Sequence, residues 1–377
     1  MTEDNLPKED DENRNSAKNT DPSESYKKHH LPEANSKDFK NPIDSDLESK
    51  TSSTESLTKP NREVNRVIEM ADKVRAELEK VIIGQEEVIE LILVGLLCNG
   101  HILLEGVPGV AKTLLVKLTA KTMQCDYSRI QFTPDLMPSD IVGTSILNMK
   151  SSEFEFRKGP IFSNFILIDE INRAPAKTQS ALFEVMEERQ ITSDNHTYSL
   201  DYPLFVIATQ NPVEQEGTYK LPEAQLDRFL FKLKLGYPSL EQEVKILERF
   251  KNDFNHAVND LINPVVSVEE LKECSDTVEK LHVKPELLNY IAKIVDSTRN
   301  NGDLYLGASP RASLNILKSS KALAAINGRS FVTPDDIRDV CGPVLNHRIL
   351  LSAEKELEGK TSEDVIKELV AKIEVPR

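Results

Sequence analysis

The spacing of hydrophobic positions divides the chain into three parts. From residue 61, apolar side chains recur at three- and four-residue steps as far as Leu78, which predicts an amphipathic helix. A second apolar helix is expected from Gln85 to about Asn99. Short apolar runs then alternate with helical segments, at residues 101–105, 128–132, 165–168, 204–208 and 229–235. This alternation predicts βαβ units and a mainly parallel sheet.

The two ends of the chain lie outside this pattern. Beyond Pro238 only helical periodicity remains. Residues 1–60 contain few apolar side chains, so they bury too little apolar surface to offset the entropy lost on ordering. We therefore expect a disordered acidic and polar tail over residues 1–60, with a binding arm as the alternative. An α/β domain over 61–237 and a smaller all-helical domain over 238–377 are expected to follow.

A glycine-containing turn that ends in Lys112 and Thr113 follows the first predicted strand. In this context backbone N–H groups and the helix N-terminus would hold a β-phosphate, Lys112 would span the β- and γ-oxygens, and Thr113 would ligate Mg²⁺. The candidate cradle consists of Gly106, Val107, Pro108, Gly109, Val110, Ala111, Lys112 and Thr113. The usual pattern has a glycine where Ala111 stands, and we expect Ala111 to adopt a negative φ at the helix start. An ordinary Gly-Pro strand–helix turn is the alternative.

Polar side chains also follow the next two buried strands. Asp169 and Glu170 come directly after the run at residues 165–168, at the carboxyl end of a strand, where such sheets bind ligands. Asp169 can hold the water shell of Mg²⁺, and Glu170 can accept a proton from an attacking water. Asn211 follows the run at 204–208 and could lie between that water and a γ-phosphate, although a turn-forming Asn before Pro212 explains it equally well.

Taken together, these segments resemble the AAA+ ATPases, and within them the MoxR family. The similarity covers about residues 61–345. It rests on the motifs GVPGVAKT at 106–113, LIDEINRAP at 167–175, ATQNP at 208–212, LPEAQLDRF at 221–229 and GASPRA at 307–312. The resemblance implies a P-loop αβα core with a mainly parallel five-stranded sheet and a small all-helical lid. It also implies a homo-oligomeric ring, usually a hexamer, that hydrolyses ATP with Mg²⁺ and remodels or matures a protein client, often a protein with a von Willebrand A-type domain.

The resemblance assigns roles to single residues. They are Lys112 and Thr113 in Walker A, Asp169 and Glu170 in Walker B, Asn211 as sensor 1, Arg228 as the arginine finger, Arg311 as the sensor 2 arginine of the lid, and Gly84 and Gln85 in a strip against the adenine. The finger acts on the nucleotide of the neighbouring subunit, where a guanidinium can contribute about 10³–10⁵ in rate. Arg173 could face the next subunit or cap a helix.

Two polar excursions are candidates for β-hairpins. Apolar and polar residues alternate around Lys150, which predicts a hairpin at about residues 144–158. Its position before the Walker B strand matches the helix-2 insert of the MoxR clade, and in related rings such hairpins point toward the pore or a client. Residues 190–202 are a candidate for a second hairpin. A purely structural role is the alternative for either one.

Composition narrows the function classes. The chain has 47 Lys and Arg against 62 Asp and Glu, a net charge of −15, so a nucleic-acid or anionic-membrane binder is not expected. The longest apolar stretch, residues 91–98, is too short for a membrane span, and no signal peptide is visible, so we expect a soluble cytoplasmic protein without membrane insertion. The four cysteines lie far apart without a CxxC motif, which argues against a disulfide framework or a structural zinc.

Two other functions remain alternatives to a client-remodelling ATPase. The first is a nucleotide-switched scaffold with little turnover, against which Glu170, Asn211 and Arg228 argue. The second is a DNA-acting AAA+ motor, which the negative charge and the lack of a Lys/Arg-aromatic cluster disfavour.

Overall fold

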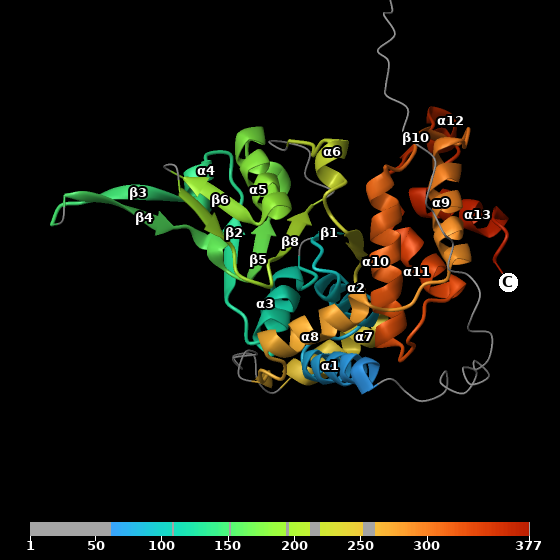
Figure 1. Ribbon diagram of the computed structural model, residues 1–377, viewed down its shortest axis with the longest axis horizontal. Coiled ribbons are helices and arrows are strands. Elements are labelled where there is room, and N and C mark those ends of the chain that lie inside the picture. The colour runs from blue at the N-terminus through green and yellow to red at the C-terminus, as the bar shows by residue number, and fades with distance from the viewer. Residues whose placement is uncertain are drawn as a thin grey trace, which may run out of the picture. The chain divides into compact units, whose positions relative to one another are not determined.

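The structure, a computed structural model, describes residues 62–107, 109–150, 152–193, 196–211, 219–251 and 261–376 (Figure 1). The predicted tail at residues 1–60 lies outside the described residues, as does Pro108 of the candidate cradle. None of the described helices has the length and apolarity that crossing a bilayer requires.

All five predicted apolar runs form one parallel sheet. Its strands are β1 (Ile102–Gly106), β2 (Tyr127–Gln131), β5 (Phe165–Asp169), β8 (Phe205–Gln210) and β9 (Phe231–Leu235). They are ordered β2-β5-β8-β1-β9, and every neighbouring pair is parallel. Because β8 lies between β5 and β1, the segments that follow these three strands emerge side by side at one edge of the sheet.

Alternate residues of the strands pack against helices on opposite faces, which gives the predicted αβα layers. On β1, for example, Leu104 belongs to one hydrophobic core and Leu103 to the other. The first core takes the apolar sides of α1 (Arg62–Glu79), α2 (Glu86–Leu97) and α3 (Lys112–Thr122). The second takes α5 (Ala176–Glu188), α4 (Pro138–Val142) and the short 3₁₀ helices η1 (Pro160–Phe162) and η2 (Ile171–Arg173).

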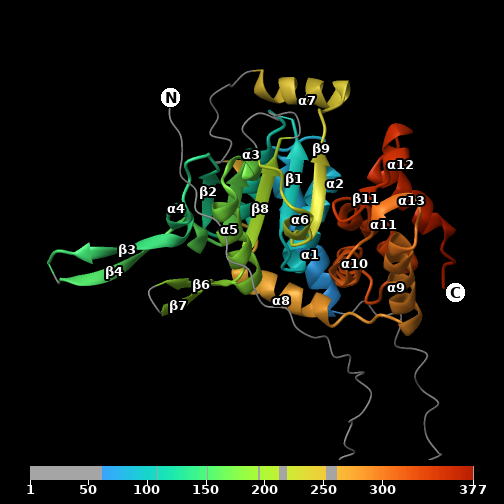
Figure 2. The same cartoon turned by 90° about the horizontal axis from the view of Figure 1, so that it is seen from above.

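Both candidate hairpins are present. The first pairs β3 (Gly143–Asn148) with β4 (Glu153–Lys158), and Figures 1 and 2 show it extending away from the sheet. The second pairs β6 (Gln190–Ser193) with β7 (His196–Ser199). The ring of Phe156 in β4 stacks on Tyr198 of β7 at 4.6 Å between centroids, so the two hairpins support one another.

The C-terminal part is helical with one exception. After α6 (Glu223–Leu226), its helices are α7 (Leu240–Phe250), α8 (Val268–Glu279), α9 (Pro285–Arg299), α10 (Pro310–Ile326), α11 (Pro334–Leu345), α12 (Ala353–Leu357) and α13 (Ser362–Lys372). Beside the predicted helices, the described residues contain a short antiparallel pair in which β10 (Leu304–Leu306) pairs with β11 (Leu350–Leu351). Strands of three and two residues are too short to leave a period-two signal.

The C-terminal helices contact the N-terminal ones directly. Helix α8 packs against α1 and α2, α10 packs against α1 and α2, and α11 contacts strand β9. Figure 2 shows α8 beside α1, although the two are far apart in sequence. The domain boundary between residues 237 and 238 therefore stays a prediction, because segments after it share a core with segments before it.

Candidate functional site

The turn between β1 and α3 closes on itself through Lys112. The Lys112 Nζ atom donates a hydrogen bond to the carbonyl oxygen of Gly106 at 2.7 Å, across the mouth of the turn. Gly106 is also restricted by packing, because a Cβ atom there would lie 2.7 Å from the carbonyl oxygen of Leu235. Thr113, the second residue of α3, is half-buried at the start of the helix. The turn thus has the strand–loop–helix context that a phosphate cradle needs.

Ala111 differs from expectation in its backbone. Its φ is 60° and its ψ is 23°, which is the left-handed region, so the predicted negative φ is wrong. The chain must turn from the loop into α3 at this residue, and the left-handed conformation makes that turn. A side chain there costs about 1–2 kcal/mol, which explains why glycine is usual at this position of the pattern.

The substitution Ala111→Gly is accordingly expected to raise the free energy of unfolding by about 0.5–1 kcal/mol, because relief of strain exceeds the entropy that glycine adds to the unfolded state. Urea unfolding measures this change. Ala181→Gly, in the middle of α5, is the control and is expected to lower stability by about 1 kcal/mol. If both substitutions lower stability equally, Ala111 is not strained.

A cavity of about 430 Å³ adjoins the cradle. It is lined by the strip at residues 81–88, by Gly109, Val110 and Ala111 of the turn, by residues 234–238 at the end of β9 and just after it, and by Ile246 and Phe250 of α7. Gly84 has a φ of 75°, in the left-handed region that favours glycine, whereas the nearby end of the flexible Gln242 side chain could move to make room for a Cβ atom. The lining side chains are largely apolar, and the cavity reaches the cradle at Gly109, Val110 and Ala111.

Gln85 links the strip at residues 81–88 to the turn between β1 and α3. Its Nε2 atom donates to the carbonyl oxygen of Val110 at 3.0 Å, which ties the strip to the turn. Its Oε1 atom is buried and has no hydrogen-bond partner among the described residues. A buried acceptor of this kind costs free energy unless it is paired, and a ligand N–H group such as the adenine amino group would pair it. The residues present therefore fit a purine nucleotide.

Asp169, at the end of β5, is held by neighbours on both sides. Thr209 of β8 donates through Oγ1 to Asp169 Oδ1 at 2.7 Å. Arg129 of β2 donates through Nη2 to Asp169 Oδ2 at 2.6 Å, and through Nε to the same oxygen at 3.1 Å. These contacts fix the carboxylate in place at the end of the strand, and carboxylate oxygens are the ligands that Mg²⁺ and its water shell prefer.

Glu170 has its own set of contacts. Its φ is 59°, a left-handed conformation that turns the chain sharply after the strand. Its backbone N–H donates to Thr209 Oγ1 at 2.9 Å, so one threonine positions both carboxylate residues. Gln131 Nε2 donates to Glu170 Oε2 at 2.8 Å, and Arg173 Nε lies 3.2 Å from the same oxygen. Arg173 thus pairs with Glu170 within the chain, a partner that neither interpretation of the sequence included.

Asn211 follows β8 directly and is buried. Since β8 lies between β5 and β1, Asn211 emerges between the strand that leads to Asp169 and the strand that leads to the cradle. The structure thereby brings the phosphate turn, the acidic pair and Asn211 to neighbouring strand ends, as the sequence predicts.

Arg228 and Arg311 lie together around a different cavity. Arg228 Nη1 is 3.2 Å from Glu187 Oε2 and donates to the carbonyl oxygen of Phe183 at 2.8 Å. Arg311 Nη2 is 2.6 Å from the other oxygen of Glu187, so one carboxylate of α5 holds both guanidinium groups. They line a cavity of about 240 Å³ that none of the described cradle residues shares. Within one chain, neither arginine therefore belongs to the nucleotide cavity.

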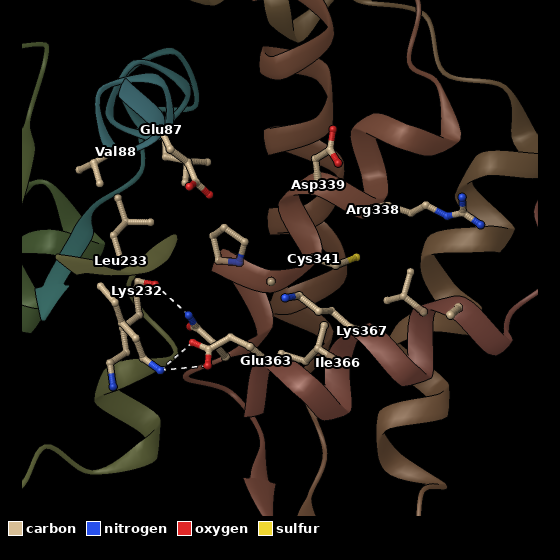
Figure 3. A pocket seen from close by; sticks show the side chains of 17 residues that line it. Glu87, Val88, Lys232, Leu233, Arg338, Asp339, Cys341, Glu363, Ile366 and Lys367 are labelled. Atoms are coloured by element: carbon tan, nitrogen blue, oxygen red, sulfur yellow. Dashed lines mark hydrogen bonds and ion pairs between the residues drawn. The ribbon is translucent and has the colours of Figure 1, made fainter. Parts of the chain in front are cut away.

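Figure 3 shows a further cavity, of about 720 Å³, between α2 and β9 on one side and α11 and α13 on the other. Lys234 Nζ lies 2.7 Å from Glu363 Oε1, which joins β9 to α13. Lys234 also lines the 430 Å³ cavity. Basic and acidic side chains are mixed around the larger cavity, so its charges do not favour one class of ligand.

Comparison with known proteins identifies the family of this chain. Residues 101–231 match the family described as "ATPase family associated with various cellular activities (AAA)", and residues 296–369 match the AAA lid domain. The chaperone MoxR1 of Mycobacterium tuberculosis is 43% identical to this chain over 310 residues, which cover 80% of this chain and 81% of the relative. The chain belongs to the MoxR family of AAA+ ATPases.

Other proteins are similar to this MoxR-family chain over most of its length. YeaC of Bacillus subtilis, an uncharacterized protein, is 46% identical over 299 residues, covering 79% of this chain and 92% of the relative. The protein MoxR of Paracoccus denitrificans is 29% identical and covers 74% of this chain and 87% of its own length. The crystal structure of an inferred ATPase from Cytophaga hutchinsonii superposes with a TM-score of 0.76 at 44% identity, over 83% of this chain and 98% of that chain.

Several side chains of the MoxR-family site carry no clear signal in the sequence. Arg129 and Gln131 read as solvated residues of a polar strand, and only the pairing of β2 with β5 places them beside Asp169 and Glu170. Glu187 reads as one of several acidic residues on the outer side of α5. The motif ATQNP contains Thr209, but nothing in its pattern shows that this hydroxyl contacts both carboxylate residues.

Proposed function

We propose that this MoxR-family protein hydrolyses ATP to ADP and phosphate with Mg²⁺, works as a homo-oligomeric ring, usually a hexamer in this family, and remodels or matures a protein client. The observation that carries the proposal is the strand order β5-β8-β1, which brings the acidic pair, Asn211 and the cradle to adjacent strand ends. In parallel α/β sheets, this edge is where ligands bind.

Each residue at this edge of the sheet has a separate role in phosphoryl transfer. Lys112 would exchange the carbonyl oxygen of Gly106 for the β- and γ-phosphate oxygens, and Thr113 and Asp169 would hold Mg²⁺. When bound, the metal neutralises charge on the phosphate oxygens and orients them. Glu170 accepts the proton of the attacking water, and Asn211 orients that water toward the γ-phosphate.

The two arginines complete the site of a neighbouring subunit. Arg228 and Arg311 line a separate cavity, so in one chain they are not available to its own nucleotide. In a ring of identical copies, the face of one subunit that carries both arginines meets the nucleotide edge of the next. The γ-phosphate then replaces Glu187 as the anionic partner of the guanidinium groups, and the permanent charge of arginine stabilises the transition state.

The β3–β4 hairpin is the surface that we assign to the client. Leu147 and Phe154 are directly opposite one another in the ladder, on the same face as the pair Ser145 and Phe156. Phe154 is 75% exposed and Leu147 is 43% exposed, so an apolar row continues outward from Phe156 into solvent. An exposed apolar row on a projecting element marks a contact for another protein. A protein with a von Willebrand A-type domain is the client class to test first.

Removal of the lysine charge tests the cradle. The substitution Lys112→Ala is expected to weaken ATP binding by at least about 30-fold, because truncating one partner of a charged contact costs about 2–5 kcal/mol. Equilibrium titration with a fluorescent ATP analogue measures this loss. Lys117→Ala removes an exposed lysine from the same helix and should leave the affinity unchanged. An equal affinity for the ATP analogue in both variants would contradict the assignment of Lys112 to the nucleotide site.

Steady-state ATP hydrolysis per subunit, measured with Mg²⁺ over a wide range of protein concentration, tests the whole proposal. Specific activity is expected to rise with concentration, because each site needs a neighbour's arginines. Bound ATP that is never hydrolysed, at any concentration and with candidate clients present, would favour a nucleotide-switched scaffold instead.

A further inference from the structure

Three consecutive side chains after α11 bind the backbone of the segment that carries Arg228. Asn346 Nδ2 donates to the carbonyl oxygen of Lys232 at 2.9 Å. His347 Nε2 lies 3.2 Å from the carbonyl oxygen of Phe229, and because a carbonyl only accepts, the imidazole donates there. Arg348 binds the same segment at three carbonyl oxygens. The lid residues Asn346, His347 and Arg348 therefore hold residues 227–232 of the AAA core, and we name these three the lid clamp.

Arg348 makes the strongest part of the lid clamp. Its Nε atom donates to Asp227 Oδ1 at 2.8 Å. Its Nη2 atom donates to the carbonyl oxygen of Asp227 at 3.0 Å and to the carbonyl oxygen of Phe229. Its Nη1 atom donates to the carbonyl oxygen of Leu230 at 3.2 Å and to that of Val344. A guanidinium has five N–H donors, and all of them are used here. The acceptors Asp227 and Phe229 are the two residues that flank Arg228.

Burial makes these contacts necessary. The Arg348 side chain is 1% exposed, and burial lowers its pKa to about 10, so it remains a cation at neutral pH. A buried charge is costly unless it is paired and fully hydrogen-bonded, and here Asp227 supplies the counter-charge. A replacement that keeps the charge but not the planar fork, such as lysine, cannot satisfy all five acceptors.

The same aspartate receives a second contact from the lid. Ser309 Oγ donates to Asp227 Oδ2 at 2.9 Å, and Ser309 lies two residues before Arg311. Asp227 is thereby held by two lid residues, Ser309 just before α10 and Arg348 just after α11. Arg228 is the next residue along the chain. The lid position and the direction of Arg228 are linked through these few contacts.

We propose that Arg348 is a positioning residue for the arginine finger: it fixes the backbone on both sides of Arg228 to the lid, so that the guanidinium is presented to the neighbouring subunit. This inference rests on the proposed function, in which Arg228 acts on a neighbour's nucleotide. A group that stabilises a transition state must be placed to within a fraction of an ångström, and a misplacement of 1 Å can cost about 100-fold in rate. All five donors of the buried Arg348 guanidinium bind acceptors of the chain itself, so its effect on the reaction would pass through the position of Arg228.

Subunit mixing separates a positioning role from a general structural one. Subunits with Arg348→Met keep an intact nucleotide site but misplace the finger, whereas Glu170→Gln subunits have an inactive site and an intact finger. We expect Arg348→Met alone to lose at least tenfold in ATP turnover with unchanged affinity for a fluorescent ATP analogue. Added Glu170→Gln subunits should restore turnover, and added Arg228→Ala subunits should not. Arg348→Lys should fall between wild type and Arg348→Met.

Arg329→Met is the matched control. Arg329 forms a bidentate ion pair with buried Asp336, at 2.6 Å for each nitrogen, inside the lid, and none of its described contacts reaches residues 227–232. Its loss removes a lid ion pair without touching the finger segment, so any turnover that it loses should not return on mixing. Turnover of Arg348→Met within twofold of wild type would overturn the proposal. The proposal would also be overturned if added Glu170→Gln subunits restored the turnover of Arg228→Ala subunits but not that of Arg348→Met subunits.

Hydrogen exchange on the unmixed variants gives a readout that does not need ATP turnover. Backbone amides of residues 227–232 should exchange at least tenfold faster in Arg348→Met than in wild type or Arg329→Met, while β5 stays protected. Unchanged exchange in this segment would overturn the proposal regardless of activity. A different pair of results would contradict the proposed function instead of the role of Arg348. In that case exchange in residues 227–232 becomes faster in Arg348→Met, but either wild-type protein does not hydrolyse ATP or mixing with Glu170→Gln subunits does not restore turnover to Arg228→Ala.

Discussion

Replacing Arg228 with alanine is expected to slow ATP turnover by about 10³–10⁵-fold at saturating ATP, the range that an arginine finger contributes to phosphoryl transfer. Nucleotide affinity should stay nearly unchanged, because the guanidinium lies around a cavity that none of the described cradle residues shares. Steady-state hydrolysis gives the rate, and titration with a fluorescent ATP analogue gives the affinity.

The control for this experiment removes another cation from the same cavity. Lys318 lines the cavity with Arg228 and is exposed, and Lys318→Ala should change turnover by less than about threefold. The arginine-finger assignment is contradicted if Arg228→Ala keeps normal turnover. It is also contradicted if affinity falls as steeply as rate, since that places Arg228 at the nucleotide of its own subunit.

The substitution Glu170→Gln is expected to leave ATP binding intact and to lower turnover by about 10²–10⁴-fold, the usual contribution of a general base. Glutamine has the size of glutamate and can still accept the hydrogen bond from Gln131, but its neutral amide does not take a proton from water. Single-turnover hydrolysis of bound ATP measures the chemical step, and a binding titration measures the affinity.

Glu184→Gln makes the same chemical change at an exposed position of α5 and should leave both quantities at the wild-type level. Near-normal turnover in Glu170→Gln would show that another group acts as the general base. A parallel loss of affinity would show instead that Glu170 takes part in holding the metal.

The sheet and both hairpins could be predicted from the sequence because their signals are local. Strands buried on both faces are continuous apolar runs, as at residues 165–168, and a hairpin shows period-two alternation around a polar turn. The cradle and the acidic pair could be predicted for a related reason. In each, the residues that carry the chemistry are neighbours in the sequence or lie directly after a strand.

Contacts that depend on the order of strands could not be predicted in this way. Arg129 meets Asp169 only because β2 lies beside β5, and the two residues are 40 positions apart. Glu187 joins Arg228 and Arg311 across separations of 41 and 124 positions, and the sequence contains no local sign of that meeting. The backbone of Ala111 was missed for a different reason, because alanine gives no hint of the left-handed conformation that glycine would have suggested.

The cavity around Glu187 also bears on how two copies of the chain approach one another. Each copy has a net charge of −15, so at long range two copies repel. This cavity is lined by four cationic side chains, those of Arg189, Arg228, Arg311 and Lys318, against the single carboxylate of Glu187. It is a local positive region on an acidic protein, and the repulsion between two copies is smaller when this region of one copy faces acidic residues of the other. In the ring proposed above, a positive region on one face of each copy would favour head-to-tail contacts over contacts between two like faces.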